Sequence, residues 1–431
     1  VAVGRLALRV NTTASNNTAV GYSALTANTT GGANVAVGSL ALDANTTASS
    51  NTAVGYSAMT VTTTGADNSA FGRGALLDNT TGASNTAVGL LALENNTTAS
   101  NNTAVGRSAL AANTTGASNV ALGTSSLGSN TTASNNTAVG FSALSLNTTA
   151  SGNVAVGYLA MQDSTTAANA TAVGYEALAN NTTSNGNHAF GFRALKTCTS
   201  GASNVAVGGS ALDAVTTGSN NVAVGSSAGG AITTGIRNVC IGESAGDHSP
   251  PLTTGNYNVV IGAYAEPTTA DAQFAIAIGY DVSGAGGYTT VGQQTNDIRA
   301  AHGTATWATV SDQRYKKDIV DSTTGLSFIN ALQPRTFKYK TLSELPETFS
   351  AYEADSTEVF KNSDTNHGFI AQEIKAAIDA DSSIADGFRL WDDRDDGSQE
   401  VAEAALIPVL TKAIQELSAQ VEALTARIET L

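Results

Sequence analysis

The sequence predicts an all-β rod, a parallel β-solenoid or β-roll of 17-residue rungs, followed by a small α+β domain that ends in a coiled coil. Three observations lead to this prediction: a glycine that recurs every 17 residues, a sharp change of composition near residue 310, and an apolar heptad pattern at the C-terminal end. With 431 residues, the chain is long enough for both parts.

The repeat is the strongest signal. The glycine of an A-V-G string stands at position 4, at every seventeenth residue as far as position 242, and, after one step of 20, at 262 and 279. Asn stands four residues before it in every copy from Gly21 to Gly262 except at Ala170. The three extra residues fall near 248–251, as a loop insertion would. A period this regular indicates stacked rungs whose equivalent residues form columns.

Each rung is expected to contain two short strands and two turns. The alternation within T-A-V-G is typical of a strand, and a second strand is expected over the x-x-A-L segment. The Asn, Thr, Ser and Gly between these segments are turn residues and poor helix formers. At a rung spacing of roughly 4.8 Å, the array gives a rod of about 80 Å over residues 1–279. Residues 280–310 are expected to form a stem.

A single coil of this kind has a thin core. Its apolar residues are mainly Val, Ala and Leu, all of modest size. Three coils side by side can share a central apolar seam formed by the Val or the Leu column. We therefore expect a homotrimer rather than a lone solenoid.

The distribution of charge also divides the chain. The net charge is -15, and residues 1–310 carry only 8 basic and 13 acidic side chains, against 12 and 22 in residues 311–431. This change places a domain boundary near 310. An acidic chain without a Lys/Arg cluster is not expected to bind nucleic acid. Without an apolar run of about 18 residues it is not expected to insert into a membrane as a helix.

Several motif matches are explained by the repeat itself. Residues 225–229 and 242–246 fit the G-x-S-x-G nucleophile elbow, but both stand where other copies read G-Y-S-A-L, without a strand-to-helix context. The N-T-T triplets match glycosylation acceptors for the same reason. The calcium repeat G-G-x-G-x-D is absent, and adjacent threonines of a strand would point to opposite sides rather than form one ice-binding array.

No disulfide, metal or cofactor is expected. Cys198 and Cys240 lie about two and a half rungs apart, roughly 12 Å along the rod, which exceeds the Cα separation of about 7 Å that a disulfide can bridge. Two free thiols are expected.

From residue 311 the composition is that of an ordinary globular domain. Residues 325–332 are expected to form a helix that Pro334 stops, and residues 336–340 a strand. Residues 343–365 are polar and expected as loop. Residues 367–378 are expected as a strand that runs into a helix, and residues 392–400 as an acidic, solvated loop.

The C-terminal end has apolar residues at alternating steps of three and four. The pattern predicts a parallel coiled coil over about 406–431, with β-branched residues mostly at a and Leu at d. The alternative is one amphipathic helix on a globular core. This a/d composition favours dimers, but the segment is short and its e and g positions are mostly uncharged. The heptad residues are Ile407, Leu410, Ile414, Leu417, Val421, Leu424, Ile428 and Leu431.

The ordered strings SDQRYKKDI, GLSFINALQPRTFKYK and HGFIAQEI, followed by the heptads, resemble the endosialidase-type intramolecular chaperone auto-processing domain, which ends many phage tail fibres and tailspikes. The resemblance covers residues 311–431. The N-T-A-V-G-x-x-A-L-x-x-N-T-T array resembles repeats that precede this domain in phage and bacterial fibre proteins, and more distantly the heads of trimeric autotransporter adhesins.

This resemblance implies a trimeric chaperone that helps three chains register and fold and then cuts itself off. The implied cleavage bond is Val310–Ser311, with Ser311 and Lys316 as the catalytic pair. Tyr315 stands where the family often has Leu.

From the residues alone, the site stays open. Ser and Lys five residues apart meet neither on a helix face nor on one side of a strand, so they can meet only across a turn or a subunit boundary. A lysine serves as a base when burial keeps it neutral. One alternative is that Ser311 and Asp312 form a turn while Lys316 is solvated. Another is a triad of Ser311, His367 and Asp312.

Two classes of function follow. The first is a trimeric structural and receptor-binding fibre, a phage tail fibre located in the virion. Its partners would be a host surface receptor such as a glycan, and other virion or fibre components upstream of Val1. The alternative is a bacterial surface or secreted adhesin fibre. A glycan-cutting tailspike needs a carboxylate pair in a cleft, and the 13 acidic residues of the first 310 are scattered.

Overall fold

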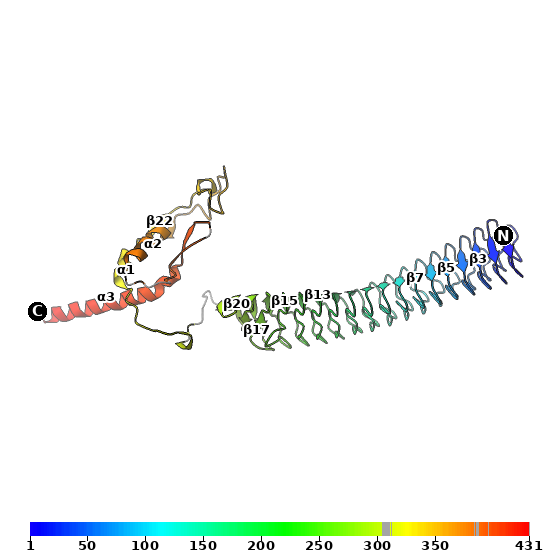
Figure 1. The fold of residues 1–431 in the computed structure, drawn as a ribbon, viewed down its shortest axis with the longest axis horizontal. Coiled ribbons are helices and arrows are strands. Elements are labelled where there is room, and N and C mark those ends of the chain that lie inside the picture. Colours follow the sequence, from blue (N-terminus) through cyan, green and yellow to red (C-terminus); the bar gives the residue numbers. More distant parts are fainter. Residues whose placement is uncertain (304–310, 312, 383, 385–387, 395, 431) are drawn as a thin grey trace. The chain divides into compact units, whose positions relative to one another are not determined.

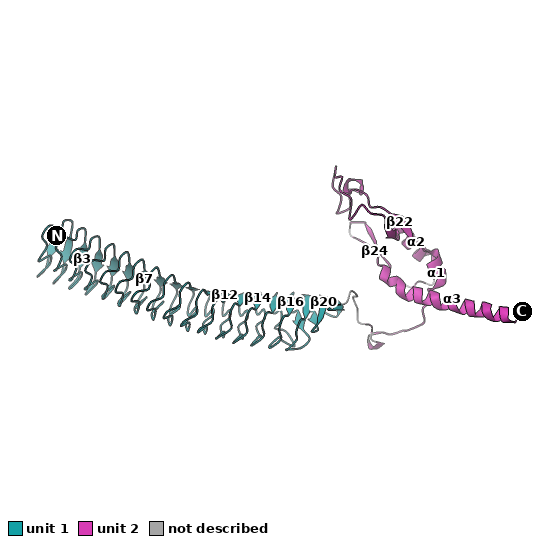
Figure 2. Cartoon of the chain, turned by 180° about the vertical axis from the view of Figure 1, so that it is seen from behind, with its two compact units in different colours: residues 1–310 teal, residues 311–431 magenta. Residues whose placement is uncertain are grey.

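The computed structural model describes the whole chain except residues 304–310, 312, 383, 385–387, 395 and 431. The chain forms two compact units, residues 1–310 and residues 311–431 (Figure 2). Each unit is described by itself. No helix in the described part of the chain is both long and apolar enough to cross a membrane.

The first unit is a parallel β-solenoid of about 17 turns with 17-residue rungs, as predicted (Figure 1). Each rung gives one short strand, and each strand pairs in parallel with the equivalent strand one rung away, so that Val20 lies beside Val3 and Val37. The strands are β1 (Ala2–Val3), β2 (Thr18–Val20), β3 (Val35–Val37), β4 (Thr52–Val54), β5 (Ser69–Phe71), β6 (Thr86–Val88), β7 (Thr103–Val105), β8 (Val120–Leu122), β9 (Thr137–Val139), β10 (Val154–Val156), β11 (Thr171–Val173), β12 (His188–Phe190), β13 (Val205–Val207), β14 (Val222–Val224), β15 (Val239–Ile241), β16 (Val259–Ile261) and β18 (Ile276–Tyr280).

The predicted second strand is wrong for most rungs. The x-x-A-L segment is a tight turn because its second and fourth residues have left-handed backbone, with φ of 53° at Ser23 and 55° at Leu25. A left-handed residue cannot continue an extended strand. In the described residues, strands at this position form only near the end of the rod, as β17 (Glu266–Pro267) and β19 (Ser283–Gly284), which pair in parallel.

Hydrogen bonds to neighbouring rungs hold these left-handed residues. Ser23 donates its N–H to the carbonyl of Arg5 in the preceding rung at 3.0 Å, and Leu25 donates to Ala41 in the following rung at 2.9 Å. A left-handed residue with a side chain costs about 1–2 kcal/mol. The rung conformation is therefore stabilised by its neighbours and not by the residues within it.

Three apolar columns fill the interior of the coil. The middle residue of each strand, represented by Ala19, and the pair represented by Ala24 and Leu25 are fully buried in nearly every rung. The Leu column is thus used inside its own coil. The last strand residue, represented by Val20, faces outward.

Two asparagine columns complete the interior. In the first asparagine ladder, Asn17 accepts the backbone N–H of Asn34 on Oδ1 at 2.8 Å. In the second, the side-chain amide of Asn45 donates to Oδ1 of Asn28 at 2.8 Å. Nearly all members of both ladders are buried, so each polar group needs such a partner. The N-T-T asparagines belong to the second ladder, which removes them from solvent in the folded rod.

Two breaks in the second ladder leave buried acceptors without donors. Thr62 and Ser164 replace asparagine, and their side chains are too short to continue the ladder. Oδ1 of Asn45 and Oδ1 of Asn147, the ladder neighbours of these residues, have no hydrogen-bond partner, nor do the two hydroxyls themselves. These breaks reduce stability, because a buried polar atom without a partner is costly.

The recurring glycine is required by geometry. Gly140 has φ of 138°, and a Cβ added to it would lie 2.2 Å from the carbonyl oxygen of Gly157 in the next rung. A side chain at this column therefore meets both a backbone conformation that L-residues rarely adopt and a neighbouring backbone atom.

A hairpin follows the last parallel pair of the rod. β20 (Tyr288–Gln293) pairs in parallel with β18, and β21 (Asn296–Ala301) pairs antiparallel with β20. Earlier along the rod, the three-residue insertion lies between β15 and β16, where Nδ1 of His248 is 3.4 Å from the buried carboxylate of Glu266.

The second unit is a small α+β domain. The predicted helix before Pro334 is confirmed as α1, and the predicted strand and helix over 367–378 are confirmed as β23 and α2. Its elements are η1 (Gln313–Tyr315), α1 (Leu326–Ala331), β22 (Arg335–Phe337), η2 (Leu342–Glu344), β23 (Asn366–Gly368), α2 (Ala371–Ala380), β24 (Trp391–Asp393), β25 (Gln399–Val401), η3 (Glu403–Ala405) and α3 (Leu406–Glu429).

Two expectations for this unit need correction. The strand expected over 336–340 ends at Phe337, where its antiparallel partner β23 begins at Asn366. The acidic segment 392–400 is not a simple loop, because β24 and β25 pair as a hairpin. Trp391 and Val401 lie opposite each other and pack on the apolar core, which favours pairing over a solvated loop.

The core of this unit joins all three helices. It contains Phe328 from α1, Ile374 from α2, and Leu406 and Val409 from α3. Two polar contacts support it. Glu416 of α3 accepts the backbone N–H of Leu326 at the start of α1, at 2.8 Å.

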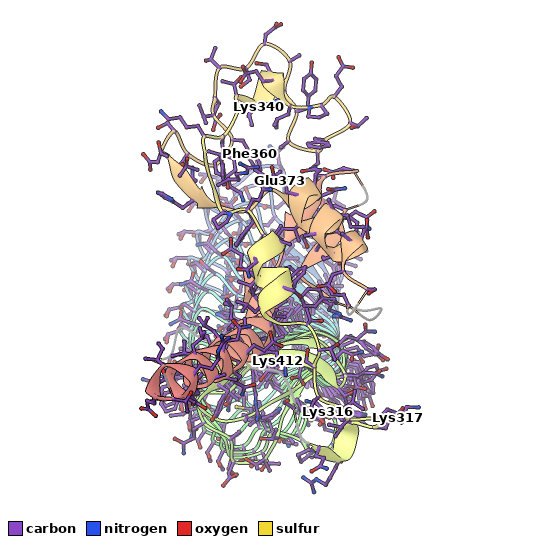
Figure 3. All side chains as sticks on the ribbon, turned by 90° about the vertical axis from the view of Figure 1, so that its left-hand side faces the viewer. Lys316, Lys317, Lys340, Phe360, Glu373 and Lys412 are labelled. Atoms are coloured by element: carbon purple, nitrogen blue, oxygen red, sulfur yellow. The ribbon has the colours of Figure 1, made fainter. Side chains whose placement is uncertain are left out.

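The second contact joins β22 to α2. The guanidinium of Arg335 donates to both carboxylate oxygens of Glu373 at 2.9 and 2.7 Å, and Glu373 is labelled in Figure 3. This hydrogen-bonded pairing lowers the pKa of Glu373 and raises that of Arg335. Both side chains are well exposed, so the pair fixes geometry more than it adds stability.

We predict that Gly140→Ala lowers rod stability by more than about 3 kcal/mol, because the new methyl group meets the next rung's backbone at a strained φ. Gly209→Ala is the matched control, since nothing lies within 4 Å of a Cβ there. The control is expected to stay within about 0.5 kcal/mol of the parent. Thermal unfolding followed by circular dichroism measures both, and equal midpoints would contradict the role of the glycine column.

Repairing the second ladder should raise stability. Thr62→Asn supplies an amide donor to Oδ1 of Asn45, so the free energy of unfolding is expected to rise by about 1 kcal/mol. Asn113→Thr creates the same break elsewhere, because Asn113 donates to Asn96 and accepts from Asn130, and should cost about 2 kcal/mol. Denaturant unfolding of the two variants checks the opposite signs. A fall for Thr62→Asn would show that the break is not a defect.

Candidate active site

Ser311 and Lys316 meet where the second unit begins. The intervening 3-10 turn η1 folds the chain back, and the N–H of Lys316 donates to the carbonyl of Gln313 at 3.0 Å. This turn brings Nζ of Lys316, the residue labelled in Figure 3, to 2.7 Å from Oγ of Ser311, to which it donates a hydrogen bond. The pair thus meets across a turn within one chain, one of the two routes that the spacing allows.

Both side chains of the pair are exposed in the single chain. An amine that donates to a hydroxyl must lose a proton before it can accept one, and burial is what disfavours the charged form of a lysine. The geometry for proton transfer is therefore present, but the dry surroundings that would activate it are not provided by these residues alone.

The other residues considered for this site lie elsewhere or cannot be placed. Val310 and Asp312 lie outside the described residues. His367 lies on β23, is exposed, and lines a groove of the second unit. The hydrogen-bond partner of Ser311 is Lys316 rather than this histidine.

The groove has a volume of about 830 Å³ and an aromatic wall. Phe337 packs edge-on against Tyr339 and Tyr339 against Phe360, with ring centroids 5.4 and 5.7 Å apart. Nζ of Lys361 lies 5.3 Å from the centre of the Tyr339 ring, within range of a cation–π contact. Asp396, in the turn between β24 and β25, also lines the groove. Its carboxylate accepts the N–H of Ser350 at 3.0 Å and so joins this turn to the long loop after η2.

The serines of the two G-x-S-x-G matches occupy turn positions of the rung. Ser227 and Ser244 have φ of 53° and 51°, as do serines at the same position in other rungs. Their N–H groups donate to the preceding rung, each at 2.8 Å. This is the backbone of the repeat and not a strand-to-helix elbow, so these serines are explained by the fold.

One surface feature of the rod was not predicted. Four residues that follow the recurring glycine, Phe141, Tyr158, Tyr175 and Phe192, form an exposed aromatic row with centroids 5.5, 5.1 and 5.5 Å apart. The rings stack face to face, so only their edges remain open to a ligand. Their 17-residue spacing in the sequence was a signal that could have revealed the row.

No cluster of three or more His, Cys, Asp or Glu side chains placed to hold a metal ion occurs among the residues that the structure describes.

Comparison with known families finds a match within the second unit. Residues 311–381 match the family model described as Chaperone of endosialidase. The match begins at Ser311 and contains Lys316. Comparisons with curated proteins and with solved structures found no match.

Cys198 and Cys240 are potential nucleophiles, but their burial makes both thiols unreactive. Both are free and fully buried in the rod, and burial raises the pKa of Cys198 to about 11 and that of Cys240 to about 12. The thiolate is the reactive form. We expect no maleimide labelling of either thiol in the native protein at pH 8, and two labels per chain after unfolding in denaturant. Mass spectrometry counts the labels, and labelling of the native chain would contradict the buried columns.

Proposed function

We propose that the chain is a trimeric structural and receptor-binding fibre, most simply a phage tail fibre, whose C-terminal unit chaperones trimer folding and then cuts itself off before Ser311. The family match over 311–381 and the β-solenoid that precedes it support this proposal. The location would be the virion, with a host surface receptor and further fibre components as partners. A bacterial surface or secreted adhesin built from the same modules is the alternative.

The hydrogen bond between Lys316 and Ser311 carries the self-cleavage part of the proposal. It lies at the boundary between the two units, so cleavage before Ser311 would separate the nearly uncharged rod from the acidic second unit. In the proposed reaction, Oγ of Ser311 attacks the carbonyl carbon of Val310 and passes its proton to Nζ of Lys316. The C–N bond breaks as the nitrogen of Ser311 takes a proton, leaving an ester between Val310 and Oγ.

Water then hydrolyses the ester. The products are the carboxylate of Val310 and the free amine and hydroxyl of Ser311, so each chain is cut once. Lys316 must be a neutral amine to act as the base. Because the pair is exposed in one chain, we infer that contact with neighbouring chains removes water from it, which makes cleavage follow assembly.

The C-terminal helix supports assembly into an oligomer. One face of α3 packs into the core through Leu406, Val409 and Ala413. The heptad residues form a different face, on which Ile414 is 66% and Leu424 55% exposed. A regular apolar face left open along a helix is typical of a coiled-coil partner surface. The family match supports a trimer rather than a dimer.

We predict that Ser311→Ala and Lys316→Ala both abolish cleavage, because the first removes the nucleophile and the second its base. Denaturing gels and intact mass measurement would show fragments of residues 1–310 and 311–431 for the parent and an uncut chain for both variants. Lys317→Ala is the matched control, since this neighbouring exposed lysine makes no contact with Ser311 among the described hydrogen bonds and should leave cleavage intact.

Native mass spectrometry of the uncut Ser311→Ala chain is expected to show a trimer. A parent chain that assembles but stays whole, or a Ser311→Ala chain still cut after Val310, would refute the mechanism. In that case the second unit is a fixed cap.

A further inference from the structure

One outward column of the rod is apolar in every rung. We call it the outer strip: the strand residue directly before the recurring glycine. The register of the parallel strands places these residues in one continuous row. The outer strip comprises Val3, Val20, Val37, Val54, Phe71, Val88, Val105, Leu122, Val139, Val156, Val173, Phe190, Val207, Val224, Ile241, Ile261, Ile278 and Val291.

No residue of the strip is buried in the single chain, where its members are half-buried or exposed. Val88 is 37% exposed, Leu122 46% and Phe190 41%, although each is a large apolar side chain. None of these residues belongs to the buried core of the coil, which the Ala and Leu columns form. The rod therefore keeps the strip apolar without using it for its own core.

A neighbouring column shows that the repeat alone does not impose this composition. The position just after the recurring glycine is also outward, and it holds residues as different as Arg73, Ser39, Gly209, Glu243 and Tyr56. The outer strip varies only among Val, Ile, Leu and Phe. A column that tolerates changes of size but no polar residue is typical of a surface that is covered.

We propose that the outer strip is the face through which the rods of three copies of this chain pack side by side. This inference rests on the trimer of the proposed function and specifies its contact surface. Of the two columns that the sequence offered for a shared seam, the Leu column is consumed inside the coil, so the Val column remains.

The dimensions of the strip fit this occupant. A three-residue strand is about 10 Å wide and the stack about 80 Å long, so the strand face has an area of roughly 800 Å² per chain. The strip is one of the two outward columns of this face, because the other column holds threonine, serine or histidine in eight of the strands β2–β12. Its share is about 400 Å² of continuous apolar surface, within the range of the largest and often functional patch of a monomer, about 300–600 Å². The whole strand face is close to the roughly 800 Å² per partner of a standard protein interface.

The length and period of the strip favour a copy of the same rod over another partner. A partner must present apolar side chains at every 4.8 Å or so over the entire stack. A second copy in parallel orientation meets this condition, because its own strip has the same spacing and length. The rod also carries only 8 basic and 13 acidic residues, so like-charge repulsion between copies is small.

The test measures thiol protection in the full chain. Val88→Cys places a thiol on the strip, and Thr98→Cys places one on a polar column of the same rung that is also exposed in the single chain. The two native cysteines are buried, so they are not expected to add to the labelling of the folded protein. In the assembled protein, Val88→Cys is expected to react with maleimide at least about tenfold more slowly than Thr98→Cys. Val224→Cys and Thr234→Cys repeat the comparison in a distant rung, should the first pair fold poorly.

Native mass spectrometry of the same samples tests the trimer separately from the strip as its contact surface. A trimer whose strip thiols react as fast as the control thiols would overturn the strip as contact surface while leaving the trimer intact. A monomer would overturn the proposed assembly and this inference together. Protection of the strip in a monomeric chain, or by a bound molecule other than a second copy, would also overturn it.

Discussion

Stacking of one rung on the next is the interaction on which this molecule depends. A rung by itself contains residues such as Ser23 and Leu25 in left-handed backbone, a glycine near φ of 140°, and two asparagines that the coil buries. Its main hydrogen bonds run to the neighbouring rungs, as from Thr18 to Asn34 and from Leu25 to Ala41. Each rung is therefore unfavourable alone and stable only on a neighbour, which makes the rod a one-dimensional cooperative array.

This dependence makes the alignment of chains a problem of its own. Because all rungs offer nearly the same edge, a chain displaced by one rung keeps almost every bond, and parallel stacking is slow. In the proposed trimer, the strip residues larger than valine, such as Phe71, Leu122 and Phe190, would distinguish one layer from another. A terminal unit with its own core and an open heptad face could set the alignment before the rungs close. Its removal would leave a rod protected by the height of its unfolding barrier.

The parts of the fold that follow from local patterns were predictable, and those that arise from stacking were not. The T-A-V strands, α1 and α2 follow from alternation and from helical periodicity. The left-handed Leu25 could not be foreseen, since leucine rarely has positive φ and neighbouring rungs hold it there. Asparagine was expected as a turn residue, yet Asn17 and Asn28 point inward because stacked amides satisfy one another.

The same distinction applies to the candidate site. The spacing of Ser311 and Lys316 required either a turn or a subunit boundary, and η1 supplies the turn. What the sequence could not indicate is the exposure of the pair, because that depends on how much of the surrounding surface one chain provides. The 17-residue spacing from Phe141 to Phe192 was visible in the sequence, but the rings contact one another only because the rungs are stacked.

The uniform rung also has a consequence for how such a rod can change over generations. Since every internal rung meets the same neighbours above and below, gain or loss of one 17-residue unit replaces each contact by an equivalent one. The near-identical repeats of a gene of this kind would favour such exchanges by recombination. Reach then varies in fixed increments of about 4.8 Å, while a three-residue insertion such as the one near His248 is absorbed at the side of the coil without changing the count. The length of the rod is therefore set by a whole number of rungs.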